Sequence, residues 1–179
     1  MYWSTDILVH QESVSTTMTQ TRFMQIWKYF HLADNSSAPP REDPGFDKIY
    51  RVRQFLGFVF RNSQRLYRLD PGVSTDKRMV PHKGHLSFKQ YRKKTIGWGI
   101  KVWVLCEART GYVFNFQVYL GKEDGHVEQH LACRVVEHLI LPIENQFCHL
   151  YMDNIYCDPH LFLELERKQV LVCETIRAN

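Results

Sequence analysis

The chain has 179 residues, of which 44% are hydrophobic and 13% aromatic, enough for a hydrophobic core and against a disordered protein. Its formal net charge of +4 is mildly basic and is compatible with a polyanionic partner. The sequence contains no apolar run of about 18 residues, so no membrane span is predicted, and its first residues show no secretory signal. The five cysteines are odd in number and contain no CxxC pair, which argues against a disulfide framework or a cysteine zinc site. Such cysteine usage favours a reducing compartment.

The N-terminal part of the chain predicts helices. Residues 19–32 place apolar side chains on one helical stripe, with a threonine as the N-cap. A loop rich in turn residues and proline follows at 34–40. A second helix is predicted over 46–66, with one apolar face and a basic outer surface. That surface is typical of a solvated helix face, and DNA binding is the alternative.

The pattern changes to strands after the turn at 70–72. A short strand is predicted over 73–76, a loop over 79–85, and a β-hairpin over 98–120. The later elements are a helix to about Leu141, a strand ending at Asp153, a helix beginning at Pro159 and a strand over 170–173. This order favours an α/β fold, a mixed sheet with helices on its faces.

Two of the predicted strands each end at an aspartate. If the strands that end at Asp76 and Asp153 lie parallel, their side chains share one edge of the sheet. Carboxylates a few Å apart suit a hard divalent cation such as Mg²⁺ or Mn²⁺. Two such ions could activate water and stabilise the leaving oxygen of a phosphodiester. A turn and helix cap at Asp153 is the alternative.

Two further groups of residues are candidates for binding. The histidines at 126 and 130 are at the i, i+4 spacing that can bind zinc on a helix, but Glu128 stands one position later than the glutamate of an HExxH motif, so a helix surface is preferred. Residues 88–101 interleave aromatic and basic side chains, as nucleic-acid surfaces do, with a charged hairpin edge as the alternative. The candidate DNA-binding residues are Lys83, Lys89, Arg92, Lys93, Lys94 and Lys101.

These residues resemble the motifs of piggyBac-type transposases. The run DKRMVPHKGHLSFKQY at 76–91 resembles the first catalytic motif of that family, although Lys77 and His85 replace a common acidic residue and a common arginine. YMDNIY at 151–156 resembles the second catalytic Asp motif. Other matching segments are 2–6, 22–23, 29–32, 47–52, 98–103, 110–113, 119–122 and 175–179. The resemblance covers nearly the whole chain.

The resemblance implies an RNase H-like core with a mixed five-stranded sheet over 70–179, preceded by a helical DNA-binding and dimerisation-like region over 1–69. It implies Asp76 and Asp153 as catalytic metal ligands, Mg²⁺ or Mn²⁺ as the cofactor, and DNA as the partner. It further implies a possible homodimer, a nuclear location, and cutting and joining at TTAA sites through a hairpin intermediate.

The resemblance also sets limits. The family's third catalytic Asp and its cysteine-rich zinc-binding tail lie beyond the matched region, so we expect no zinc site and no efficient cleavage from these 179 residues alone. One alternative is a domesticated DNA-binding or interaction protein that has lost catalysis. Another is a small nuclease in which Asp158 or Glu174 completes the site, although they are read as a helix cap and as the far end of the last strand.

Overall fold

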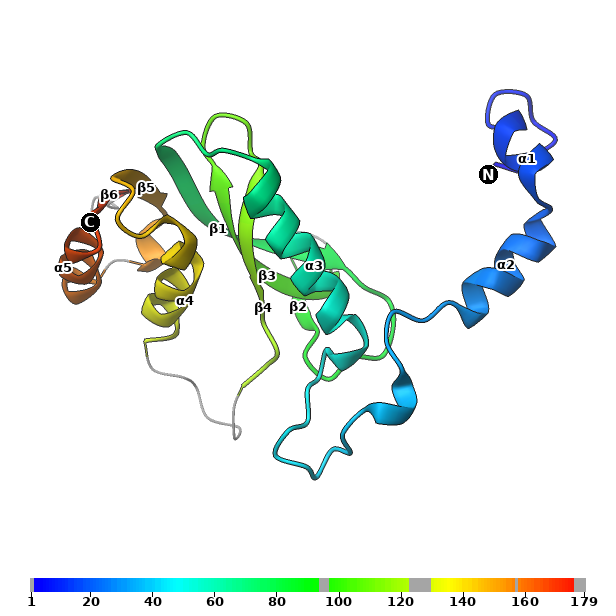
Figure 1. Cartoon of the computed structure of the whole chain (residues 1–179), viewed down its shortest axis with the longest axis horizontal. Coiled ribbons are helices and arrows are strands. Elements are labelled where there is room, and N and C mark those ends of the chain that lie inside the picture. Colours follow the sequence, from blue (N-terminus) through cyan, green and yellow to red (C-terminus); the bar gives the residue numbers. More distant parts are fainter. Residues whose placement is uncertain (1, 94–96, 123–129, 157, 176–179) are drawn as a thin grey trace. The chain divides into compact units, whose positions relative to one another are not determined.

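The computed structural model describes residues 2–93, 97–122, 130–156 and 158–175 (Figure 1). The chain forms two compact units, Met1–Phe55 and Leu56–Asn179. Their boundary falls inside helix α3 (Tyr50–Leu66), which begins four residues later than predicted. Among the described residues, no helix combines the length and the apolar character that a membrane span requires.

The first unit consists of short helices that hold a row of aromatic rings. Its elements are α1 (Glu12–Thr17), α2 (Gln20–Tyr29), the 3-10 turn η1 (Asn35–Ser37) and the start of α3. The Thr19 side chain accepts a hydrogen bond from the Arg22 amide and caps α2, as predicted, whereas α1 is absent from the expected elements. The aromatic stripe of α2 continues from Trp3 to Phe23, Trp27 and Phe30, with successive ring centroids 5.2, 6.1 and 6.4 Å apart.

The second unit is built on one mixed sheet. Its strands are β1 (Gly72–Pro81), β2 (Gln90–Arg92), β3 (Gly97–Glu107), β4 (Val113–Val118), β5 (Cys148–Met152) and β6 (Val170–Glu174). The order is β2-β3-β1-β5-β6, and β4 pairs with β3. Strand β3 is antiparallel to β1, β2 and β4, whereas β1, β5 and β6 are parallel. Five strands have at least five residues, so the predicted mixed sheet and its hairpin are confirmed, with the short β2 added.

Strand β1 is longer than its sequence pattern predicts. It continues to Pro81 because residues 77–81 pair with 99–103 of β3, so the predicted loop is wrong for its first three residues. Gly99 makes this close pairing possible. A Cβ atom on Gly99 would lie 2.7 Å from the Val80 carbonyl oxygen, closer than real Cβ contacts allow.

Helices cover the two faces of the sheet. The face that carries Val73, Thr75 and Leu105, named the α4 face, packs against α4 (Leu131–Ile140) in a core completed by α5 (Pro159–Arg167). The Asn115 side-chain amide on this face donates to the Leu139 carbonyl at 2.8 Å. The opposite face is named the α3 face, because Phe60 of α3 contacts Phe116 of β4 with ring centroids 6.3 Å apart (Figure 1).

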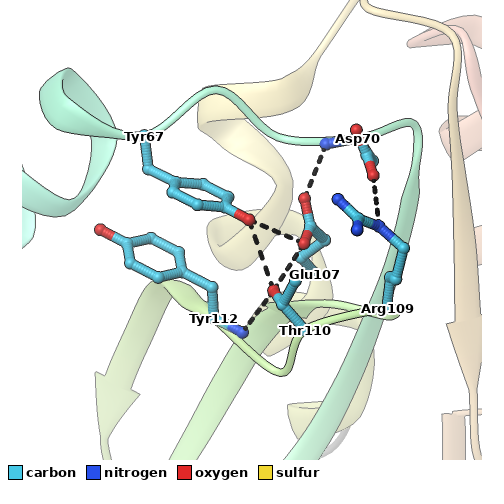
Figure 2. A network of polar contacts seen from close by, with 6 residues as sticks. All are labelled: Tyr67, Asp70, Glu107, Arg109, Thr110 and Tyr112. Carbon is cyan, nitrogen blue, oxygen red and sulfur yellow. Dashed lines mark hydrogen bonds and ion pairs between the residues drawn. The ribbon is translucent and has the colours of Figure 1, made fainter.

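A buried carboxylate fixes the segment that leads into β1 (Figure 2). Glu107, at the end of β3, is 1% exposed and accepts hydrogen bonds from the Tyr67 hydroxyl at 2.8 Å and the Asp70 amide at 2.9 Å. The Thr110 hydroxyl in the hairpin turn also donates to it. These bonds, the one from Thr110 first, lower the pKa of Glu107. Glu107 thus ties the turn before β1 to the β3–β4 hairpin.

Tyrosine stacking and an ion pair reinforce this connection. The Tyr67 and Tyr112 rings stack with centroids 3.9 Å apart, and the Tyr112 hydroxyl donates to the Ser63 carbonyl of α3. Arg109 of the hairpin pairs with Asp70 at 2.8 Å (Figure 2). The start of β1 is therefore held from both sides.

Candidate metal centre

The register of β1 against β5 aligns the two predicted aspartates. The paired residues differ by 77 in number, as in Ser74 opposite Tyr151, and the ladder ends two residues before Asp76 and Asp153. Asp76 and Asp153 have the same offset, 153 − 76 = 77, two residues beyond this ladder. The prediction that a strand ends at Asp76 is wrong, because β1 continues to Pro81 and Asp76 lies inside it, whereas β5 ends one residue before Asp153. Neighbouring strands lie about 4.8 Å apart, so we expect the two side chains to lie near each other beside the end of β5. The parallel strands predicted from the sequence are confirmed.

Both aspartates are exposed, and Asp76 belongs to the α3 face. Asp76 is directly opposite Val104 of β3, and residues in register share a face of the sheet. Asp153 follows the buried Met152, and its carboxylate accepts a hydrogen bond from the Asn154 amide at 2.8 Å. The remaining carboxylate oxygens are hard donors of the kind that Mg²⁺ and Mn²⁺ prefer, so the residues present fit a divalent cation.

A buried tyrosine, which the sequence did not single out, lies close to both carboxylates. Tyr156 ends the 3-10 turn η3 (Asn154–Tyr156), is 3% exposed, and lies beside the side chain of Thr75. Burial, followed by the negative charge of Asp76, raises the pKa of Tyr156 to about 12, and Asp153 adds a smaller effect in the same direction. One hydroxyl thus senses the charge of both aspartates.

The two carboxylates considered as a third ligand are positioned differently. Asp158 accepts hydrogen bonds from the His160 amide at 2.8 Å and from Cys133 Sγ at 3.3 Å, so it is the predicted N-cap of α5. Glu174 is opposite Met152 in the β5–β6 register, which places it on the α4 face, away from Asp153. Its carboxylate oxygens are buried. This placement argues against the nuclease alternative.

The histidine pair gives no zinc site that the structure can describe, because residue 126 lies outside the described part of the chain. His130 directly precedes α4, and its Nδ1 atom is 3.7 Å from Asp158. Cys133 contacts the same carboxylate, and burial raises the pKa of its thiol to about 11. A protonated thiol that donates to a helix cap is a structural contact and is a poor metal ligand.

The candidate DNA-binding residues are distributed over both faces of the sheet. Lys101 lies on the α4 face, with Nζ 4.3 Å from the Trp103 ring centroid, and burial lowers its pKa, with the charge of Arg92 adding to the effect. Lys89 contacts the opposite face, with Nζ 4.9 Å from the Trp98 ring centroid. The other candidates are Lys83 and Lys93, which are exposed outside the strands, and Lys94, which lies outside the described residues.

Comparison with known proteins identifies the family. The model of the family described as Transposase IS4 matches residues 1–179. PiggyBac transposable element-derived protein 3 of Homo sapiens is 33% identical over 124 residues, which are 68% of this chain and 20% of that protein. PiggyBac transposable element-derived protein 2 of Homo sapiens is 26% identical over 183 residues, covering 99% of this chain and 30% of that protein. The chain therefore spans less than a third of these relatives.

A solved structure shares the fold. The piggyBac transposase in a synaptic complex with hairpin DNA superimposes with a TM-score of 0.82 at 24% sequence identity, covering 98% of this chain and 38% of that chain. The α/β fold with its RNase H-like mixed sheet is thus that of the piggyBac transposase catalytic domain. The chain belongs to the Transposase IS4 family and contains a piggyBac-like DDE transposase domain.

Proposed function

We propose that Asp76 and Asp153 jointly bind a divalent cation, Mg²⁺ or Mn²⁺, and that the chain supplies this part of the catalytic centre of a DNA transposase. The observation that supports the proposal is the parallel β1–β5 pairing, whose 77-residue offset is also that between Asp76 and Asp153. The DDE family to which the chain belongs implies divalent metal use.

The residues of the chain define what this centre can do. The exposed carboxylates of Asp76 and Asp153 would hold the cation where a DNA phosphate can approach. When bound there, a divalent cation would supply Lewis-acid chemistry for phosphodiester cleavage, while the two carboxylates would hold it in position. Since neither Asp158 nor Glu174 is placed as a third ligand, the cation is held weakly, and these 179 residues alone do not cleave DNA efficiently.

DNA is the proposed substrate, and TTAA sites are the proposed target. The solved relative is in complex with hairpin DNA, and the family relationship supports the same class of substrate here. The exposed Lys83, Lys93 and Arg92 lie beyond the end of β1 and around β2, where they can neutralise phosphates. This binding is electrostatic and should weaken as salt is added.

Two measurements test the proposal. Isothermal titration with Mn²⁺ should detect a weak site that Asp76→Asn and Asp153→Asn each abolish, while Glu166→Gln on the exposed face of α5 leaves it intact. Nicking of a TTAA-containing plasmid with Mg²⁺ or Mn²⁺ should stay at background. Unchanged metal binding in both aspartate variants would overturn the site, and robust cleavage would overturn the predicted inactivity.

The charged β2–β3 end also supports a second candidate function, DNA binding without catalysis. Lys89 and Arg92 flank this end on opposite faces of the sheet. In this case the chain binds duplex DNA whether or not a metal is present. The logarithm of its association constant should fall linearly with the logarithm of the salt concentration, with a slope of about −0.9 for each phosphate that is neutralised. Binding that is equal in wild type and Asp153→Asn would favour this function over the metal-dependent one.

A further inference from the structure

Two exposed aromatic side chains form a cross-strand pair at the β2–β3 end of the sheet. Tyr91 of β2 is directly opposite Trp98 of β3, and their ring centroids are 5.3 Å apart. The side chains are 59% and 51% exposed, respectively. A pair that only stabilised the strand pairing would gain most by burying its rings, whereas these rings remain largely open to solvent.

A fixed positive charge accompanies the pair. The Lys89 ammonium lies 4.9 Å from the Trp98 ring centroid and donates a hydrogen bond to the Gly84 carbonyl at 3.0 Å. The hydrogen bond holds the ammonium against the ring. An aromatic surface beside an anchored cation is complementary to a nucleobase attached to a phosphate.

We propose that Tyr91 and Trp98 form a stacking site for the unpaired bases of single-stranded DNA, with Lys89 contacting an adjacent phosphate. Duplex DNA does not satisfy this site, because paired bases are stacked on each other and do not offer a free π-face. An unpaired base offers its face whatever its identity, so the site should show little sequence preference. The inference rests on the proposed function for the choice of DNA as the ligand.

The position of the pair relates it to the carboxylates. Trp98 and Val104 are on the same face of β3, and Val104 is opposite Asp76, so the stacking site and the metal centre share the α3 face. Val104 and Trp98 are six positions apart along β3, which corresponds to about 20 Å of strand. That distance is the length of about six stacked nucleotides at 3.4 Å each. A single-stranded end can therefore reach both places at once.

The test compares single-stranded and duplex DNA with the full chain at low salt. Trp98→Ala should weaken binding of a single-stranded oligonucleotide about 5- to 140-fold, the range that stacking on one aromatic residue supplies. Binding of the fully paired duplex should change less than about twofold, because phosphate contacts dominate it. Trp98→Phe, which keeps a stacking ring, should recover most of the loss. Phe147→Ala, at an aromatic residue that is 63% exposed before β5, is the matched control.

A second readout does not depend on affinity. Photocrosslinking with an oligonucleotide that contains 5-bromodeoxyuridine should mark Trp98 or Tyr91, as mapped by mass spectrometry. Equal losses for both kinds of DNA in Trp98→Ala, no recovery in Trp98→Phe, or crosslinks confined to other residues would each overturn the stacking site. Duplex binding without a single-strand effect would reject this inference alone, whereas absence of binding to either DNA would reject DNA as the substrate as well.

Discussion

Replacing one of the paired aspartates should stabilise the protein and remove its response to metal. At the spacing of neighbouring strands, about 5 Å, two carboxylates in a water-like medium repel each other by about 0.8 kcal/mol. The shared 77-residue offset of β1 and β5 leads us to expect this separation for Asp76 and Asp153. Asp153→Asn should therefore raise the free energy of unfolding by about 0.8 kcal/mol in the presence of a chelator. For a unit of this size the melting temperature should rise by about 3 °C.

Asp153→Asn should also reduce the stabilisation that a bound metal provides. A cation at 100 times its dissociation constant stabilises a folded protein by about 2.7 kcal/mol, and the variant should lose most of that gain. Urea unfolding followed by circular dichroism, with EDTA or with saturating Mg²⁺, measures both effects. Glu166→Gln removes an equal charge from an exposed position on α5 and should change neither quantity.

A double-mutant cycle gives the strongest test of the pairing. Either single substitution already removes the whole repulsion, so Asp76→Asn combined with Asp153→Asn should gain about 0.8 kcal/mol, and not the sum of the two single effects. Additive effects of the two substitutions would show that the carboxylates do not interact. Equal stabilisation of wild type and both single variants by Mg²⁺ would refute a shared metal site.

Three further predictions concern the fold. Glu107→Gln should reduce the loss of stability on acidification, as measured by urea midpoints between about pH 3 and 7. The pKa of Glu107 is lowered, chiefly by the hydrogen bond from Thr110, so its carboxylate stabilises the fold above the unfolded pKa of about 4.3, and this stabilisation is lost as pH falls through the folded pKa. Gly99→Ala should lower the free energy of unfolding in urea by about 1–3 kcal/mol, because the new Cβ atom would clash with the backbone of β1. Gly57→Ala in α3 has space for a Cβ atom and should raise it by up to about 1 kcal/mol, so equal effects would contradict the close approach. Leu139→Ala, at a fully buried position, should cost about 2–5 kcal/mol, and Leu163→Ala, at an exposed one, no more than about 0.5 kcal/mol; a small loss at Leu139 would place it outside the core.

Local sequence patterns were sufficient to predict the main elements. The alternating arms of the β3–β4 hairpin, the Asp158 cap with Pro159 behind it, and the apolar run that ends at Asp153 are all signals within a few residues. Strand β1 was predicted too short because Lys77, Arg78 and Pro81 are poor strand signals by themselves. Its extension depends on pairing with β3, which is a tertiary interaction that local propensity does not report.

The sequence selected the candidate residues of the site, whereas their surroundings depend on the fold. Strand ends and motif resemblance identified Asp76 and Asp153, but only the ladder of β1 and β5 could show that they have the same register. Tyr156 carries no local signal, because a tyrosine after a strand is usually a core residue, and its proximity to both carboxylates depends on the fold of η3. Glu107 lies within the predicted hairpin at 98–120, but the bonds that its carboxylate accepts from Tyr67 and the Asp70 amide come from residues distant in sequence, which local patterns do not report.

The parallel pairing of β1 and β5 has a consequence for how such a domain can vary. A hairpin fixes its register through the length of its turn, but a parallel pair fixes it through its own hydrogen bonds. The segment between the two strands can therefore gain or lose residues, for example at the hairpin tip around Arg109, without separating the carboxylates. A single deletion inside β5, by contrast, would turn Asp153 towards the buried face. Family members should thus tolerate length changes between the two aspartates far better than within either strand.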